Sequence, residues 1–200
     1  GVKKFIFAST GGAIYGEHDY FPADEEHPVR PSAPYGINKN CVEKYLYYYN
    51  LVYGLDYIVL RYANVYGPRQ NPHGECGVIA IFTDKILGGT QPLINGDGKQ
   101  TRDYVFVKDV VNANVLAVDA KGPMIYNVAT TRETDVNYIF DRINHYAGTK
   151  FEEKHGPGKL GEQMRSVLSF EKISTELGWQ PETDIETGLK ITTEFFKQKK

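Results

Sequence analysis

Tyr35 and Lys39 stand four residues apart at the start of a segment with helical periodicity, "PYGINKNCVEKYLYYYNLVY". On a helix this spacing places two side chains next to each other on one face. A phenol, with an ordinary pKa of about 10, is a poor base at neutral pH, but a nearby ammonium favours its charged form. The pair could therefore remove a proton from a substrate alcohol, as one half of an oxidoreduction.

The same spacing occurs twice more, in a chain with 15 tyrosines. Tyr104 and Lys108 straddle a predicted strand-to-helix junction, where four extended residues span roughly 13 Å. Tyr146 and Lys150 flank a glycine at a predicted helix end, where we expect solvent. Only the first pair follows a predicted strand that ends in hydroxyl groups, so the sequence favours Tyr35 as the reactive tyrosine.

Those hydroxyl groups belong to Ser9 and Thr10, which directly follow the apolar run "KFIFA". The next predicted strand ends in Tyr62 and Asn64. Ligands of parallel sheets bind beyond the carboxyl ends of the strands. Because the helix that carries Tyr35 lies between these two strands in the chain, we expect its first turn to face the same crevice.

Strands and helices alternate along the sequence, which predicts an α/β fold with a mainly parallel sheet. Strands are expected within 4–9, 56–64, 93–107 and 124–129, and helices over 34–53, 78–89, 108–120, 135–148, 170–178 and 185–198. Thr134 is the predicted N-cap of the helix that follows it. The segment 9–32, rich in glycine, proline and acidic residues, is expected to be a loop.

The composition excludes several function classes. A net charge of −2 gives no broad basic field, so no nucleic-acid partner is expected. The two cysteines, Cys41 and Cys76, form no CxxC motif, which is typical of a reducing compartment and predicts a cytoplasmic location. No apolar stretch is long enough for a membrane span. His73 and Cys76 alone would make a poor metal site, so no metal is predicted.

Six blocks of the sequence, in order, resemble one known family: "FIFASTGGAIYGE", "PSAPYGINKNCVEKYL", "VLRYANVYGPRQ", "INGDGKQTRDYVFVKDVV", "YNVAT" and "LGWQP". It is the extended short-chain dehydrogenase/reductase family of NAD-dependent epimerases and dehydratases, and the chain most resembles its UDP-glucose 4-epimerases. The resemblance implies the C-terminal part of a Rossmann-type doubly wound parallel sheet plus a smaller α/β substrate lobe. It places part of the NAD-binding domain at 1–75 and 103–130, and the sugar-nucleotide lobe at 76–102 and 131–200.

The resemblance also implies NAD as the cofactor, a UDP-sugar as the substrate and a role for each reactive residue. Tyr35 corresponds to the catalytic base, and Lys39 to the partner of the nicotinamide ribose. Thr10 corresponds to the proton bridge, with Ser9 as the second candidate. The implied cofactor-binding residues are Ala8, Ser9, Tyr35, Lys39 and Tyr62. The implied substrate-binding residues are Thr10, Asn64, Gly77, Val78, Arg102, Lys159, Glu162 and Ser166.

Arg102 suits a diphosphate because its guanidinium can donate to two oxygens at once. An ion pair with a nearby aspartate, Asp103 or Asp97, is the alternative. Lys159 stands where the family usually has an arginine; it can neutralise phosphate but lacks the two-pronged geometry. Ser166 matches a position that sets the width of the sugar pocket in some epimerases, and an ordinary surface serine is the alternative.

The implied reaction is 4-epimerisation, in which transient oxidation at C4 lets the sugar turn over before reduction on its other face. The family's 4,6-dehydratases need a pair of acids directly after the threonine. Here Gly11 and Gly12 follow Thr10, which favours an epimerase. A dehydratase, another reductase of the family and a non-catalytic sugar-nucleotide-binding remnant remain the alternatives.

The glycine-rich phosphate turn of a dinucleotide site is absent from these residues. In the family it precedes the segment that resembles "GVKKFIFAS". We therefore expect the 200 residues to lack the pyrophosphate cradle and to require an N-terminal half or a complementary chain. The resemblance further implies a homodimer that pairs through the helices predicted at 34–53 and 78–89.

Overall fold

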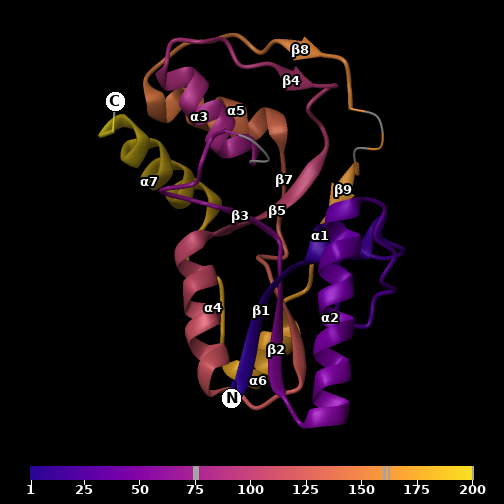
Figure 1. Ribbon diagram of the computed structural model, residues 1–200. Coiled ribbons are helices and arrows are strands. Elements are labelled where there is room, and N and C mark those ends of the chain that lie inside the picture. The colour runs from indigo at the N-terminus through magenta and orange to yellow at the C-terminus, as the bar shows by residue number, and fades with distance from the viewer. Residues whose placement is uncertain (74–76, 160, 162, 200) are drawn as a thin grey trace.

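The computed structural model describes residues 1–73, 77–159, 161 and 163–199. A lower lobe is built on a parallel sheet, and an upper lobe packs helices around short strands (Figure 1). None of the helices within the described residues is long and apolar enough to cross a membrane.

The sheet of the lower lobe has the strand order β1-β2-β6 and is parallel throughout. Its strands are β1 (Lys4–Thr10), β2 (Asp56–Tyr62) and β6 (Met124–Val128). Thr10 pairs with Tyr62, and Tyr62 pairs with Val128, so the carboxyl ends of all three strands are level. The predicted parallel strands are confirmed, although the second ends two residues early, at Tyr62.

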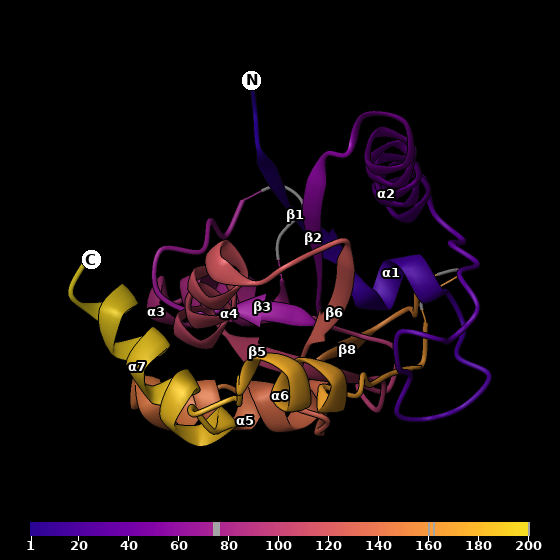
Figure 2. The ribbon, with the colours of Figure 1, turned by 90° about the horizontal axis from the view of Figure 1, so that it is seen from below.

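Helices cover both faces of this sheet, as a doubly wound fold requires (Figure 2). They are α2 (Pro34–Tyr53) on one face, and α4 (Val107–Asp119) and α6 (Glu171–Leu177) on the other. Tyr57 and Val59 of β2 pack with Leu46 of α2. Ile58 and Leu60 point the other way, into the cluster formed with α4 and α6. Burial on both faces explains why β2 is a continuous apolar run.

Helix α2 has clear start and stop signals. Pro34 occupies its first turn, where the missing N–H costs nothing. Gly54 ends it with a left-handed φ of 67°, and its N–H bonds to the carbonyl of Asn50. Near the start, Gly36 allows a close approach, because a Cβ there would lie 2.3 Å from the carbonyl oxygen of Ala13. The close approach at Gly36 packs the first turn of α2 against α1 (Gly11–Tyr15), which directly follows β1.

The upper lobe joins short strands to three helices. Its strands are β3 (Asn64–Tyr66), β4 (Ile94–Asn95), β5 (Thr101–Phe106), β7 (Glu133–Asp135), β8 (His155–Gly156) and β9 (Arg165–Ser166), and its helices are α3 (Val78–Leu87), α5 (Val136–Ala147) and α7 (Ile185–Lys197). The core of this lobe contains Ile79 and Phe82 of α3, Ile139 and Phe140 of α5, and Leu189 of α7. The helices predicted over 78–89, 135–148 and 185–198 are therefore confirmed as α3, α5 and α7, each with apolar side chains in this core.

Two local predictions were wrong. The segment 9–32 is not only loop, because a short helix, α1 (Gly11–Tyr15), follows β1 directly. The N-cap of α5 is Asp135 rather than Thr134: the Asp135 carboxylate accepts the N–H of Tyr138 at 2.7 Å. Thr134 lies one residue too early, within β7, because the helix begins at Val136.

Chain segments that follow the upper-lobe helix α5 in sequence return to pack on the lower lobe. Helix α6 and Trp179 pack on the lower sheet, although the predicted division puts 131–200 in the substrate lobe. Helix α3 packs on α5 and α7 in the upper lobe, away from α2 (Figure 1). The two helices expected to form the dimer surface therefore do not make one continuous face.

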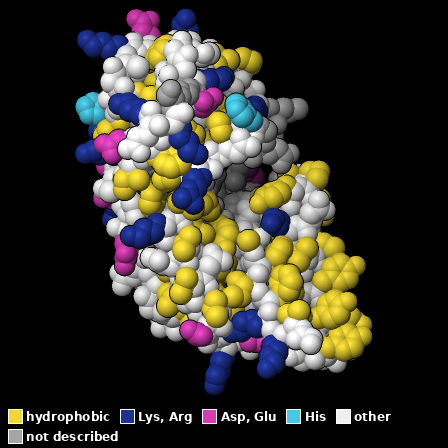
Figure 3. Space-filling view, turned by 60° about the vertical axis from the view of Figure 1, so that its left-hand side comes forward, with side chains coloured by type: hydrophobic (Ala, Val, Ile, Leu, Met, Phe, Trp, Pro, Cys, Tyr) yellow, Lys and Arg dark blue, Asp and Glu magenta, His cyan; other side chains and the backbone are white. Residues whose placement is uncertain are grey.

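Exposed apolar side chains gather on the lower lobe. Helix α4 carries Val111, Val115 and Val118 outward, and α2 carries several tyrosines outward. Figure 3 shows hydrophobic side chains gathered over the lower half of one face. Patches of this kind mark surfaces that pack against other polypeptide segments.

Candidate active site

A cleft of about 600 Å³ lies beyond the carboxyl ends of β1 and β2, where ligands of parallel sheets bind. It is lined by Ser9, Thr10, Tyr35, Tyr62, Ala63, Asn64, Val65, Tyr66, Gln70, Gly77, Ile79 and Tyr104. The fold thus brings together six of the residues predicted from the sequence to form one site: Ser9, Thr10, Tyr35, Tyr62, Asn64 and Gly77.

Tyr35 and Lys39 lie on one face of α2, as their spacing predicts. The Lys39 Nζ is 5.7 Å from the centre of the Tyr35 ring and 5.0 Å from that of Phe7. It donates a hydrogen bond to the carbonyl oxygen of Ala8 at 2.7 Å. The Tyr35 side chain is 51% exposed and lines the cleft, so its hydroxyl is open to a ligand.

The other two tyrosine–lysine pairs have no such arrangement. Tyr104 is buried in the upper core on β5, while Lys108 is exposed beyond the junction with α4. Tyr146 donates its hydroxyl proton to Glu186 and accepts a hydrogen bond from Arg142, while Lys150 is exposed beyond the end of α5. Tyr35 is thus the only one of the three tyrosines whose described lysine neighbour shares a helix face with it.

Ser9 and Thr10 differ sharply although they are adjacent. The Ser9 side chain is 3% exposed, and its hydroxyl donates to the Glu43 carboxylate at 2.6 Å. Thr10 ends β1 and is only half-buried. Within the described part of the chain, no hydrogen bond involves the Thr10 hydroxyl, which therefore stands free at the cleft.

Glu43 belongs to a buried ion pair that the sequence analysis missed. Arg61 of β2 donates from Nη2 to Glu43 at 2.6 Å and from Nε at 3.1 Å. Burial disfavours the charged guanidinium, yet the hydrogen bond and the charge of Glu43 raise the pKa of Arg61. Arg61 also donates to the hydroxyl of Tyr15, and burial raises the pKa of Tyr15 to about 12. The missed signal was spacing, because Glu43 lies four residues beyond Lys39 on the same helix face.

Tyr62 presents its ring to the cleft, but its hydroxyl points away, donating to Asn114 of α4 at 2.9 Å. Asn64, at the start of β3, is exposed in the cleft. At the start of α3, Gly77 and Ile79 line the cleft, whereas Val78 packs against the upper core. The residues on either side of Val78 therefore line the cleft, and the Val78 side chain packs elsewhere.

Arg102 and Ser166 are register partners on β5 and β9. Arg102 donates to the carbonyl oxygen of Thr101 at 2.8 Å. Ser166 is 3% exposed, so it is not a surface serine. A Cβ added to Gly12 would lie 3.1 Å from the Ser166 Oγ, which places Ser166 directly behind the turn that follows Thr10.

Asp103, one of the two suggested partners of Arg102, has other donors. Its buried carboxylate accepts the N–H groups of Thr130, Thr131 and Leu168 and the hydroxyl of Thr130. Burial raises the pKa of Asp103 to about 6, against the lowering effect of these hydrogen bonds. Asp103 thus ties the ends of β6 and β9 together beside Arg102.

Two of the predicted phosphate-neutralising residues lie away from the cleft lining. The side chain of Lys159 is exposed, and Arg102 borders β9. Glu162, also predicted to contact substrate, lies outside the described residues. No group of three or more metal-ligating side chains is found in the ranges that the structure describes.

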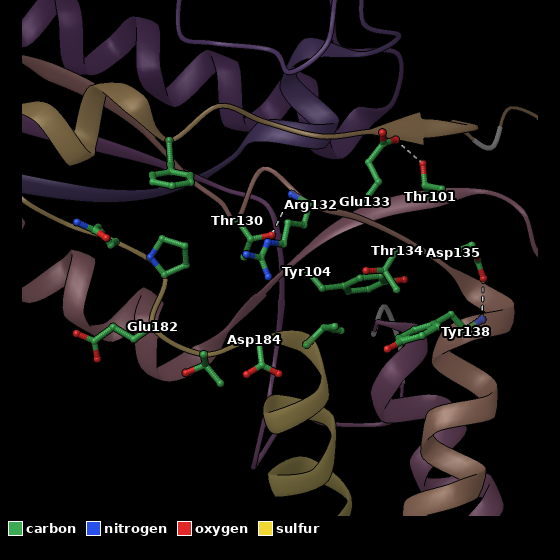
Figure 4. A pocket seen from close by; sticks show the side chains of 15 residues that line it. Thr101, Tyr104, Thr130, Arg132, Glu133, Thr134, Asp135, Tyr138, Glu182 and Asp184 are labelled. Carbon is green, nitrogen blue, oxygen red and sulfur yellow. Dashed lines mark hydrogen bonds between the residues drawn. The ribbon is translucent and has the colours of Figure 1, made fainter.

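A second cavity, of about 700 Å³, lies between β5, β7 and the connection from α6 to α7 (Figure 4). Two of the acids that line it are helix N-caps: Asp135 accepts from the N–H of Tyr138, and Asp184 accepts from that of Thr187 at 2.9 Å. Glu133 accepts from the hydroxyl of Thr101 at 2.7 Å. None of the residues predicted to be functional lines this cavity, so the cleft at the sheet edge is the candidate site.

Known proteins resemble this chain over nearly its whole length. Residues 1–129 match the NAD dependent epimerase/dehydratase family. A putative UDP-glucose 4-epimerase of Methanocaldococcus jannaschii is 46% identical over 98% of this chain and 64% of its own length. The crystal structure of the Thermotoga maritima UDP-glucose 4-epimerase with UDP-glucose superposes with a TM-score of 0.96 at 48% identity, covering 100% of this chain and 65% of that one.

The crystal structure of the Thermus thermophilus UDP-glucose 4-epimerase in complex with NAD superposes with a TM-score of 0.91 at 41% identity, over 98% of this chain and 64% of that one. The chain thus spans a little under two thirds of the length of these relatives. The family match covers the cleft, its tyrosine–lysine pair and the parallel sheet beneath them. The chain therefore belongs to the NAD-dependent epimerase/dehydratase family.

Proposed function

We propose that this chain forms the catalytic and substrate-binding part of an NAD-dependent UDP-glucose 4-epimerase. The observation that carries the proposal is the placement of Thr10 and Tyr35 in one cleft, with Lys39 beside Tyr35. A relative that is 48% identical over the whole chain was crystallised with UDP-glucose. The remaining third of the protein is proposed to be an N-terminal segment that carries the glycine-rich phosphate turn, and "completed protein" below means the two parts joined.

The residues of the cleft fit the nicotinamide end of NAD. Lys39 uses one of its three N–H donors on Ala8, which leaves the others for ribose hydroxyl groups. Tyr35 stands at the rim and the ring of Tyr62 forms a wall. NAD bound there would accept a hydride from C4 of the sugar and later return it to the opposite face.

Side chains of this chain transfer the proton of the sugar O4 hydroxyl. The Thr10 hydroxyl hydrogen-bonds the sugar O4 and relays its proton to the phenolate oxygen of Tyr35. The ammonium of Lys39 lies 5.7 Å from the centre of the Tyr35 ring. When the hydride returns to C4, Tyr35 gives the proton back to O4, so no net acid or base is consumed. Arg102 and Lys159 are proposed to neutralise the diphosphate, with Asn64 and Gly77 beside it.

A 4,6-dehydratase is the second candidate, and the packing of α1 disfavours it. Elimination of water needs an acidic side chain directly after Thr10 to donate a proton. A Cβ at Gly11 would lie 2.1 Å from Leu168, and one at Gly12 would lie 3.1 Å from Ser166. A side chain at Gly11 would therefore require the Leu168 side chain to move, and one at Gly12 would require a smaller shift of Ser166.

Ser166→Tyr in the completed protein is expected to change sugar preference. Because Ser166 is buried behind Gly12, a phenol ring there would crowd the segment that follows Thr10. If the cleft accepts both UDP-glucose and its N-acetylated form, the ratio of their kcat/KM values should shift at least about tenfold against the bulkier substrate. Ser166→Ala is the matched control and should keep the ratio. An equal loss on both substrates would place Ser166 outside the sugar pocket.

We also propose that the completed protein is a homodimer that pairs through the outer face of α2. Tyr45, Tyr49 and Tyr53 follow one another at helical spacing, and all are exposed. The Tyr49 and Tyr53 rings already pack 5.5 Å apart. Stripes of exposed aromatic residues are enriched at interfaces.

Tyr49→Lys with Tyr53→Lys should convert the dimer into a monomer, because two facing ammonium groups per helix would be buried without partners. Light scattering after size-exclusion chromatography measures the mass. Tyr20→Lys, an exposed tyrosine on the loop after α1, is the control and should leave the dimer intact. A dimeric double variant would show that the copies pair elsewhere.

A further inference from the structure

A buried network joins α2 to the carboxyl ends of β1 and β2. Tyr35, Lys39 and Glu43 follow one another at four-residue spacing and face the sheet. Glu43 accepts a hydrogen bond from Ser9 of β1 at 2.6 Å and two from Arg61 of β2. These three network side chains are at most 5% exposed.

We propose that Glu43 is a positioning residue, which holds Ser9 so that the next residue, Thr10, is the one that relays the proton. The inference deepens the proposed epimerase function and rests on it. Lys39 holds the carbonyl of Ala8 and Glu43 holds the side chain of Ser9, so α2 fixes two consecutive residues of β1. These two attachments hold the backbone directly before Thr10 and so fix the orientation of Thr10 at the end of β1.

Ser9 and Thr10 differ in whether their hydroxyl group is free to donate a hydrogen bond to the substrate. A serine has a single O–H, and that of Ser9 is committed to the ion-paired carboxylate of Glu43, a stronger acceptor than a neutral sugar oxygen. Ser9 therefore cannot donate to the substrate unless it leaves Glu43. The Thr10 hydroxyl, by contrast, has no hydrogen-bond partner within the described ranges of the chain. The family resemblance leaves both hydroxyls as candidates, and the contacts separate them.

Arg61 explains why the network can be buried. It neutralises Glu43 with two hydrogen bonds and uses a third N–H on Tyr15, whose hydroxyl in turn donates to Asn127 of β6. Every strand of the lower sheet is thereby connected to α2 through one chain of contacts. A shift of Glu43 would move the strand ends on which the cleft is built.

The test compares three variants of the completed protein. Thr10→Val, which keeps the shape and removes the hydroxyl, should lower kcat at least about 100-fold with a much smaller change in KM. Ser9→Ala should lower kcat by only about tenfold, through misplacement of Thr10. Thr192→Val, which removes a buried hydroxyl of α7 outside the network, is the control and should lower the unfolding temperature while keeping kcat.

Glu43→Met, which keeps the length of the side chain and removes both acceptor oxygens, completes the test. It should reproduce the kcat loss of Ser9→Ala, and adding Ser9→Ala to it should cost nothing further, because both remove the same attachment. If Glu43→Met does not fold, the Ser9→Ala and Thr10→Val values still decide. Ser9→Ala with unchanged kcat, or with a loss equal to that of Thr10→Val, would overturn the positioning role. Failure of the epimerase proposal itself would be seen separately, as absence of epimerase turnover in the completed protein without any substitution.

Discussion

Tyr35→Phe in the completed protein is expected to lower epimerase turnover at least about 100-fold, the size of effect typical of losing a general base. The substitution removes one oxygen from a side chain that is half exposed at the cleft rim, so the fold should be unchanged. Sugar-nucleotide affinity should also be kept, because the phenol acts on O4 and not on the diphosphate. Turnover is measured by coupled assay, and affinity by calorimetric titration of the UDP-sugar.

The other two tyrosine–lysine pairs supply matched controls. Tyr146→Phe should leave turnover within a few-fold, because the Tyr146 hydroxyl is bound to Glu186 and Arg142 in the upper lobe. Tyr104→Phe should also stay within a few-fold, although Tyr104 borders the cleft, because it is packed in the upper core. Near-normal turnover by Tyr35→Phe, or an equal loss at either control, would show that the wrong tyrosine was chosen.

The local parts of the site could be predicted from the sequence because they depend on spacing along single elements. Tyr35 and Lys39 share a face of α2 since four residues make about one helical turn. Thr10 and Tyr62 meet because parallel strands end at the same sheet edge, and the register pairs them directly. Both inferences needed only the type of each element, which hydrophobic periodicity indicates well.

Features that depend on tertiary contact could not be predicted in the same way. The pairing of Ser166 with Arg102 joins β9 to β5, and no periodicity links a two-residue strand to a partner so far away in sequence. The commitment of Ser9 to Glu43 likewise depends on how α2 packs on β1. The position of α6 on the lower sheet follows from burial of Trp179, whose Nε1 donates to the Asp109 carbonyl. These contacts explain why the Ser9 hydroxyl is committed to Glu43 and why Ser166 is buried.

The absence of a glycine-rich phosphate turn from the 200 residues is expected to weaken their binding of a dinucleotide. The nicotinamide end would contact Tyr35, Lys39 and Tyr62, all on the described cleft or beside it. The pyrophosphate is normally held by the N-terminus of a helix after a glycine-rich turn, and the sequence contains no such turn. In addition, β1 is an edge strand of its sheet, paired on one side only within the described residues, with Phe5 exposed. Such an edge invites association with other strands.

The 200-residue chain alone is therefore expected to bind NAD at least about a thousandfold more weakly than the completed protein, which corresponds to losing about 4 kcal/mol of contacts. It should also fail to turn over UDP-glucose, because the hydride acceptor would not be retained. Titration calorimetry with NAD, run on the 200 residues and on the completed protein, measures the first effect, and an epimerase assay on both measures the second. Joining the N-terminal segment of a close family relative should restore both, since its strands would pair with the open edge of β1. Micromolar NAD affinity with turnover by the 200 residues alone would mean that the cleft around Tyr35 and Lys39 suffices to hold the cofactor.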